Sequence, residues 1–335
     1  MPDGSLASDI AALLDVPPSR AAEIRLEPCA TGGNNRVYVA TLDERKWVVK
    51  QYFRHPGDTR NRLQSERAFL NYATGAGIAC VPRVIACDSG RGIGVYEFIE
   101  GRKLVAGEIN GAVVHEAAEF FCSLNDAACR SSARELPAAS EACFSTADHF
   151  AMVDSRLAKL DTVDAGDETG RAARQFIGEL RARWGAVKSE IRKVQPGRSL
   201  EAEVPERCIS PSDFGFHNAI ARLAGPLCFV DFEYAGWDDP AKMAGDFFSH
   251  PAVPVPRDHF ESFVRRTMGF SRHSDELVAR AHLLLPIFQT KWCCIILNEF
   301  VPLSAQRRRF ANPELDEDTR RREQLGKART LFEKI

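Results

Sequence analysis

Between residues 24 and 99, apolar positions alternate with polar ones over short runs rich in β-branched and aromatic residues. Such runs, separated by Gly, Asn, Asp and Pro, are typical of β-strands. One segment differs, because Leu63, Phe69 and Leu70 recur at helical spacing. The pattern predicts three strands, one helix and two more strands, in that order, at Ile24–Cys29, Arg36–Thr41, Trp47–Phe53, Thr59–Ala73, Val81–Cys87 and Gly94–Ile99.

After Gly101 the apolar spacing becomes helical. Helices are expected over residues 115–125 and 171–194, two short strands at 208–209 and 227–232, and further helices from about residue 259 onward. The sequence therefore predicts an α+β chain of two lobes. Residues 1–100 form a small β-rich lobe with a five-stranded antiparallel sheet and one helix, and residues 101–335 form a larger, mostly helical lobe.

Composition narrows the class of protein. The chain is 44% hydrophobic and has a formal net charge of −2, so it lacks the global positive charge that holds nucleic acid or an anionic membrane. Its ten cysteines include no Cys-x-x-Cys pair, and its first residues lack a secretory signal pattern. We expect a cytoplasmic protein with free thiols and no nucleic-acid or membrane partner, and the oligomeric state stays open.

The most apolar stretch, residues 283–303, approaches the length of a membrane span. It contains Lys291, Asn298 and Glu299, which are costly in hydrocarbon. We therefore expect a helix of the protein core there.

A glycine-rich turn, Gly32-Gly33-Asn34, separates the first two strands. Backbone N–H groups in such a turn can approach phosphate oxygens, although an ordinary hairpin turn has the same composition.

Lys50 ends the third strand, and Glu66 lies on the helix that follows. A lysine held by a glutamate presents a fixed positive charge to nucleotide phosphates, and the alternative interpretation is two unrelated solvated charges.

Two further motifs place oxygen donors on loops. Four residues separate Asp213 from Asn218, and Asp231 and Glu233 follow an apolar strand. An aspartate on a tight loop can accept the proton of an attacking hydroxyl, and carboxylate and amide oxygens suit Mg²⁺. Each motif alone also fits a turn rich in Asp and Gly. Their joint order along the chain, from glycine-rich turn to Asp-Phe-Glu, predicts a kinase.

In this order the motifs resemble those of the aminoglycoside phosphotransferase and choline kinase superfamily, small-molecule relatives of the protein kinases. The likeness runs from about residue 24 to 248 and is most specific in Asp231-Phe-Glu-Tyr-Ala-Gly-Trp, with Asp246-Phe-Phe following. It implies a bilobal protein-kinase-like fold. It also implies a hinge at Tyr96–Gly101, where the backbone of Glu97 to Ile99 binds the adenine of ATP, with GTP as an alternative.

The resemblance and the charges together assign roles to these residues. Lys50, paired with Glu66, binds the triphosphate with the glycine-rich turn; Asp213 orients the acceptor hydroxyl. The expected metal ligands for Mg²⁺ are Asn218, Asp231 and Glu233. Family members usually carry a histidine just before the catalytic aspartate, whereas this chain has Pro211-Ser212. We expect Asp246 to brace the loop instead by accepting backbone N–H bonds.

The acceptor is a small molecule with a hydroxyl, such as a sugar or an amino alcohol. Asp213 and Glu233 are expected to meet it, and Trp237, Trp292 and Tyr234 could form an aromatic cage for a cation. Lys291 equally suits a phosphate or carboxylate. Three other functions stay open: an aminoglycoside-modifying kinase, a catalytically inactive nucleotide-binding module, and a protein kinase. Only about fifteen residues separate Asp231 from Asp246, which disfavours the last.

Overall fold

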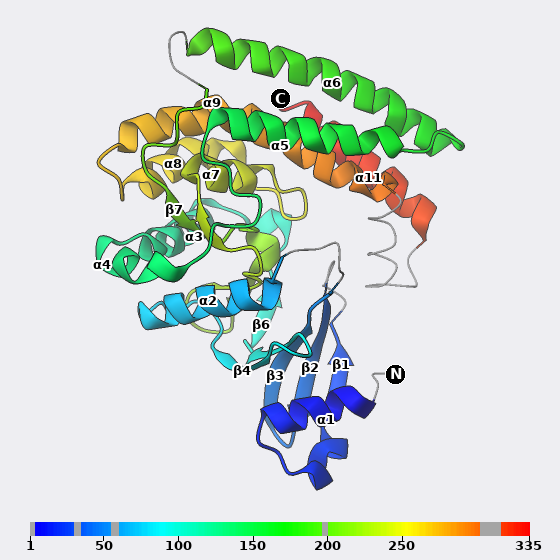
Figure 1. The fold of residues 1–335 in the computed structure, drawn as a ribbon, viewed down its shortest axis with the longest axis vertical. Coiled ribbons are helices and arrows are strands. Elements are labelled where there is room, and N and C mark those ends of the chain that lie inside the picture. Colours follow the sequence, from blue (N-terminus) through cyan, green and yellow to red (C-terminus); the bar gives the residue numbers. More distant parts are fainter. Residues whose placement is uncertain (1–3, 30–34, 55–59, 196–199, 302–315) are drawn as a thin grey trace.

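A five-stranded antiparallel sheet forms the amino-terminal part of the molecule (Figure 1). The computed structural model describes residues 4–29, 35–54, 60–195, 200–301 and 316–335. The strand order in the sheet is β1-β2-β3-β5-β4. The strands are β1 (Arg25–Pro28), β2 (Arg36–Leu42), β3 (Arg45–Gln51), β4 (Val84–Asp88) and β5 (Ile93–Glu97), each antiparallel to its neighbours.

One face of this sheet packs against α1 (Gly4–Leu13), which the sequence analysis did not predict. Tyr38 and Ala40 alternate with less buried residues along β2, so their side chains share one face. Leu6 and Ile10 of α1 belong to the same apolar cluster. The first lobe therefore has more than the one helix expected, and the 3₁₀ turn η1 (Pro18–Glu23) joins α1 to β1.

The expected helix of this lobe is α2 (Arg62–Gly75). It begins later than predicted, because the side chain of Asn61 accepts the N–H of Gln64 and caps the first turn. The predicted start, Thr59, lies outside the described residues. Phe69 and Leu70 of α2 belong to the large apolar cluster that also includes the carboxy-terminal helices. The lobe division at residue 100 therefore stays a prediction, since this apolar core crosses it.

Helices dominate the rest of the chain (Figure 1). Short 3₁₀ turns, η2 (Ala106–Glu108) to η7 (Asn298–Phe300), join several of them. The described helices of this part are α3 (Gly111–Leu124), α4 (Ala127–Arg130), α5 (Thr146–Lys159), α6 (Glu168–Val194), α7 (Pro240–Ser249), α8 (Phe260–Met268), α9 (Ser274–Leu297) and α11 (Glu317–Phe332). Together they confirm a small sheet-containing part and a larger helical one.

The helix α9 lies at the centre of this bundle and packs against α5, α6, α7, α8 and α11. By length and composition it is the one described helix that is long and apolar enough to cross a membrane. However, 72% of its most apolar window is buried inside the protein. The structure thus supports a core helix in this region.

Two small sheets hold the loops that join the helical part to the large sheet. One has the order β6 (Gly101–Lys103), β8 (Ala219–Arg222) and β9 (Cys228–Phe229). The other pairs β7 (Cys208–Ser210) with β10 (Gly236–Asp238). Gly101 has φ 158°, and a Cβ there would lie 2.4 Å from the carbonyl oxygen of Ala221, so this crossing requires glycine.

Candidate active site

Lys50 and Glu66 form a buried ion pair, with 2.6 Å between Nζ and Oε1. The strand β3 and the helix α2 carry them, as the sequence predicted. The Glu66 carboxylate also accepts the hydroxyl of Tyr52, which contacts the Tyr96 hydroxyl at 2.7 Å. These contacts fix the carboxylate, and the carboxylate in turn fixes the ammonium group.

Asp231 meets the same lysine from the other side. Its Oδ1 lies 2.8 Å from Nζ of Lys50, and the next amide, that of Phe232, donates to Glu66 at 3.3 Å. Burial alone would lower the pKa of Lys50, but Asp231 and Glu66 raise it above its ordinary value. The lysine is therefore a permanent positive charge between two carboxylates. Asp231 has φ 71°, a strained conformation that is typical of functional sites.

The loop of Asp213 is held by residues other than Asp246. The buried side chain of Asn125, directly after α3, bonds both backbone groups of Ile209, and the hydroxyl of Ser210 accepts the N–H of Ser212 at 3.0 Å. Ser212 has φ 66°. Asp246 instead accepts the indole N–H of Trp292 at 2.9 Å and contacts two lysines. The expectation that Asp246 braces this loop is corrected, because α7 directs its carboxylate toward α9.

Two stacked imidazoles lie beside Asp213. The rings of His217 and His250 are parallel within 2°, with centroids 3.6 Å apart. Their Nε2 atoms lie 3.4 and 3.9 Å from Oδ1 of Asp213. Burial alone would raise the pKa of this carboxyl, but His217, His250 and, last, Lys291 lower it to about 2. Asp213 is therefore ionised at neutral pH and can accept a hydrogen bond from a hydroxyl.

Asn218 is positioned next to Asp231 by the β8–β9 hairpin. The N–H of Val230 donates to the carbonyl of Asn218 at 2.9 Å, and the Asn218 side-chain amide donates to the carbonyl of Asp213 at 3.0 Å. Among the described residues, Oδ1 of Asn218 has no donor. The hairpin thus holds the backbone of Asn218 beside the segment that leads into Asp231, and amide and carboxylate oxygens are hard donors that fit Mg²⁺.

Glu233 is buried, and its carboxylate is already bonded within the protein. It accepts the side-chain amide of Asn35, whose own Oδ1 accepts the N–H of Phe53, and it lies 3.8 Å from Nε of Arg62. Burial and the charge of Asp231 raise its pKa to about 7. Asn35 directly follows Gly32, Gly33 and Asn34, which lie outside the described residues. Glu233 therefore ties the exit of the glycine-rich turn to the segment of Asp231.

The expected hinge lies at the end of β5. The N–H of Glu97 donates to the carbonyl of Arg83 at 2.9 Å, and the Glu97 side chain contacts the same arginine. The N–H of Ile99 has no acceptor among the described residues. Of the backbone groups predicted to bind adenine, the Glu97 N–H is thus already used within the protein, whereas the Ile99 N–H can still donate to a ligand.

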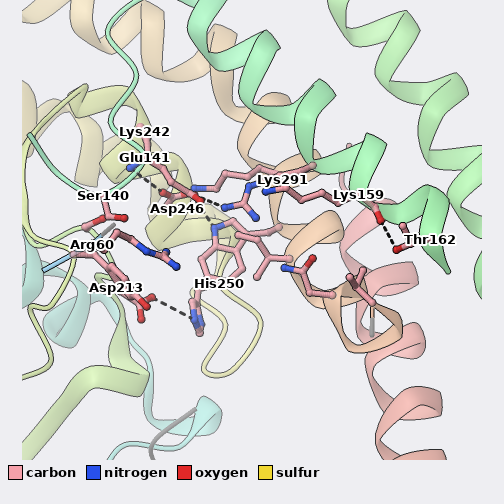
Figure 2. Close-up of a pocket in the computed structure, with 17 residues that line it drawn as sticks. Arg60, Ser140, Glu141, Lys159, Thr162, Asp213, Lys242, Asp246, His250 and Lys291 are labelled. Carbon is pink, nitrogen blue, oxygen red and sulfur yellow. Dashed lines mark hydrogen bonds and ion pairs between the residues drawn. The ribbon is translucent and has the colours of Figure 1, made fainter. Parts of the chain in front are cut away.

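A cavity of about 630 Å³ opens beside Asp213 (Figure 2). Trp292 lines it, whereas Trp237 does not: the indole of Trp237 donates to the carbonyl of Ala133 at 3.1 Å. The sequence analysis missed His250 and Lys242, which also line the cavity. Both lie on or just after α7, a helix whose residues are all buried in the structure.

Comparisons with known proteins agree with this geometry. No curated protein sequence matches the chain. A structure of choline kinase from Cryptosporidium parvum Iowa II is similar at 14% identity and TM-score 0.56, covering 99% of this chain and 97% of that one. A choline/ethanolamine kinase family protein from Mesorhizobium loti is similar at 20% identity and TM-score 0.60, covering 98% and 95%. A structure of the streptomycin–ATP–APH(2")-IIa ternary complex is similar at 13% identity and TM-score 0.56, covering 88% of this chain and 90% of that one.

These similarities show the fold, which is that of protein-kinase-like small-molecule kinases. The sequence model of the phosphotransferase enzyme family matches residues 25–242, which is most of the chain and includes the large sheet, the loop of Asp213 and the segment of Asp231. The chain therefore belongs to the phosphotransferase enzyme family.

Proposed function

We propose that this chain is a cytoplasmic kinase that transfers the terminal phosphoryl group of ATP to a small-molecule hydroxyl in a Mg²⁺-dependent reaction. The observation that carries the proposal is the position of Lys50, held between Glu66 and Asp231 at 2.6 and 2.8 Å. An ion pair of this kind belongs to nucleotide sites of kinases, where it must be formed for phosphoryl transfer. All ten cysteines are free thiols, which supports a reducing compartment.

In the proposed reaction, the acceptor oxygen bonds to the terminal phosphorus while the bond from that phosphorus to the bridging oxygen of ATP breaks. Asp213 accepts a hydrogen bond from the attacking hydroxyl and aligns it, and the proton leaves toward solvent as the phosphate ester forms. A carboxyl with a pKa of about 2 is a weak base. This suits phosphoryl transfer, which depends on positioning and charge more than on proton removal.

Lys50 binds the phosphates of the nucleotide, and Ile99 donates its backbone N–H to the adenine. Asn218 and Asp231 would hold Mg²⁺, which supplies charge neutralisation for the terminal phosphate. Glu233 has Asn35 and Arg62 as partners, so we assign it to the alignment of the glycine-rich turn first and to the metal second. GTP can use the same backbone contacts and is the alternative donor.

The test is a screen of hydroxylated metabolites with ATP and Mg²⁺, read by ADP release and by mass analysis of the product. Calorimetry of ATP with and without Mg²⁺ runs in parallel. We expect Mg²⁺-dependent ATP binding and at least one phosphorylated acceptor. Binding of ATP without turnover above the level of the Asp213→Asn variant would instead identify an inactive nucleotide-binding module.

A further inference from the structure

The cavity beside Asp213 has a composition that the reaction itself does not explain. Five of its lining residues are basic and three are acidic. The basic ones come from the segment before α2 and from α5, α7 and α9, and are Arg60, Arg156, Lys159, Lys242 and Lys291. In the view of Figure 2, His250 and Lys291 lie between Asp213 and Lys159. The basic groups thus extend away from the carboxylate that would meet the hydroxyl.

Two of these lysines lie close to the same carboxylate, that of Asp246. Asp246 contacts the ammonium of Lys291 through Oδ1 and lies 3.8 Å from Nζ of Lys242 through Oδ2. Asp246 also accepts the indole N–H of Trp292. Lys242 has a second carboxylate, that of Asp238, which lies outside the cavity lining. Among the described residues, Lys291 has no second carboxylate within ion-pair distance.

The remaining cations of the helices differ in their partners. Arg156 is paired with Glu141 at the cavity wall. Lys159, at the end of α5, has no carboxylate partner among the described residues and is exposed at the cavity. Apart from Asp213, each acidic group at the cavity is therefore already paired with a lysine or an arginine, and Lys159 is left without a carboxylate in the part of the chain that the structure describes.

Burial makes the excess of basic over acidic residues costly. Lys291 is buried, and burial together with the neighbouring charges of Lys242 and Arg156 lowers its pKa, with Asp246 offsetting only part of the effect. A buried ammonium is stable when opposite charge surrounds it. An anionic group in the cavity would complete the surroundings of Lys291, whereas a cationic group would add to the repulsion.

An aromatic cage for a cationic acceptor is also poorly developed. The ring of Tyr234 already has the guanidinium groups of Arg60 and Arg62 over it, each 5.8 Å from the centroid. The ammonium of Lys291 lies 5.7 Å from the ring of Trp292. The cation-binding faces of these two cavity aromatics are therefore shared with the protein's own cations.

We propose that the acceptor carries an anionic group, a carboxylate or a phosphate, in addition to the hydroxyl that is phosphorylated, and that Lys159 and Lys291 bind this group. The inference rests on the proposed kinase function and adds the class of substrate. Nε2 of His250 lies 3.9 Å from Oδ1 of Asp213, and the centroid of the His250 ring lies 4.4 Å from that of Trp292, the residue next to Lys291. An elongated acceptor thus places its hydroxyl at Asp213 and its anionic group among the lysines.

The experiment compares acceptors that share a carbon skeleton and differ in charge. One set is glucose, glucosamine, glucuronate and glucose 6-phosphate. The other is glycerol, 3-amino-1,2-propanediol, glycerate and glycerol 3-phosphate. ADP release is measured with ATP and Mg²⁺, after calorimetry has established ATP binding. We expect kcat/KM to be at least about tenfold higher for an anionic member than for its neutral and cationic partners, and the carboxylate and phosphate arms identify which anion is preferred.

Lys159→Gln tests the mechanism of this preference, because it removes one exposed positive charge without leaving a buried carboxylate unpaired. We expect the preference for the anionic acceptor to fall about three- to tenfold, mainly through KM. Lys193→Gln removes the same charge from the exposed surface of α6, and its preference should equal that of the wild type. Lys291→Met should weaken the preference further, and urea unfolding establishes that this variant is folded.

The acceptor comparison can either support or overturn the proposal of an anionic acceptor. A higher kcat/KM for glucose, glucosamine or a glycerol-derived neutral or cationic acceptor overturns it while leaving the kinase function intact. If no member of either set is turned over, binding of the same compounds is followed by tryptophan fluorescence in the presence of Mg²⁺ and ADP. Tighter binding of the anions, weakened by Lys159→Gln, supports the inference, and equal or weaker binding overturns it. Absence of ATP binding contradicts the proposed function itself.

Discussion

Lys50 and Lys291 are both buried lysines that contact carboxylates, with 8% and 4% of their surface exposed, but the sign of the charge around them differs. Lys50 forms ion pairs with both Glu66 and Asp231, and Glu233 lies nearby. These negative charges raise the pKa of Lys50. Lys291 pairs with Asp246, a carboxylate that also lies near Lys242. Burial and the neighbouring cations lower the pKa of Lys291.

This difference indicates which charge a ligand would supply at each end of the candidate site, one end being the surroundings of Lys50 and the other those of Lys291. At Lys50 two carboxylates, those of Glu66 and Asp231, contact one ammonium group, and oxygen donors of this kind suit a ligand that includes Mg²⁺. The end around Lys291 has more cations than carboxylates, which suits an anion. Asp213 lies where the two ends meet, with Asn218 bonded to its carbonyl and His250 beside its carboxylate. The four predictions below test this contrast, beginning with the group between the two ends.

The largest expected effect is on Asp213. The change Asp213→Asn preserves size but removes the negative charge that aligns the hydroxyl, so turnover should fall about 10²–10⁴-fold. ATP affinity should stay near that of the wild type, because this interaction matters chiefly in the transition state. Steady-state kinetics and calorimetry check both parts. A loss of ATP affinity as large as the loss of turnover would place Asp213 at the nucleotide instead.

The next prediction compares the two lysines directly. Lys50→Met leaves Glu66 buried without its cation, so the free energy of unfolding should fall by about 3–5 kcal/mol. Lys291→Met leaves Asp246 with Lys242 and Trp292, so its loss should be smaller, about 1–2 kcal/mol. Urea denaturation without ligands measures both. Equal losses would show that the two surroundings do not differ in the way described.

A third prediction concerns the pH dependence of stability in the absence of nucleotide and Mg²⁺. The pKa of Glu233 is raised from 4.5 to about 7 by burial and by Asp231. Its stabilising contribution is thus fully present below pH 4.5 and is lost as pH rises through 7. Relative to Glu233→Gln, the wild type should therefore lose stability between pH 5 and pH 8, by at most about 3 kcal/mol.

Urea unfolding at the two pH values measures this difference for Glu233→Gln. The matched control is Glu44→Gln, which removes a carboxylate from the exposed turn between β2 and β3. This control should follow the wild type at both pH values. A constant difference between wild type and Glu233→Gln from pH 5 to pH 8 would contradict the assigned titration.

The smallest expected effect concerns the metal. Asn218 and Asp231 are the proposed ligands of Mg²⁺, so Asp231→Asn should reduce the gain in ATP affinity that Mg²⁺ provides by about tenfold, or about 1.4 kcal/mol. Calorimetry at several Mg²⁺ concentrations measures this gain. The variant Asp154→Asn changes an acid that pairs with Lys188 away from the site, and serves as control. An unchanged gain in Asp231→Asn would contradict the proposed ligand set.

Local patterns were sufficient to predict the sheet and the long helix. The five strands of the large sheet were predicted with small errors at their ends, since alternation and turn residues are local signals. The helix expected over 171–194 is α6 (Glu168–Val194). The helix α5 was missed, although Ser145 and Asp148 form a capping box that could have located its start. α1 was missed although Leu6 and Ile10 are spaced as on one helix face.

The sequence by itself determined the family and the order of Lys50, Glu66, Asp213, Asn218 and Asp231, because each lies in a short motif with its own neighbours. The charge of the cavity beside Asp213 was decided only by tertiary structure. Its basic groups lie on α5, α7 and α9, far apart in the chain, and whether a charge is free depends on which carboxylate the packing brings to it. Sequence spacing carries no information on such long-range neutralisation. From the sequence, Lys291 fits either a core residue or a residue that binds a ligand, and only the structure pairs it with Asp246.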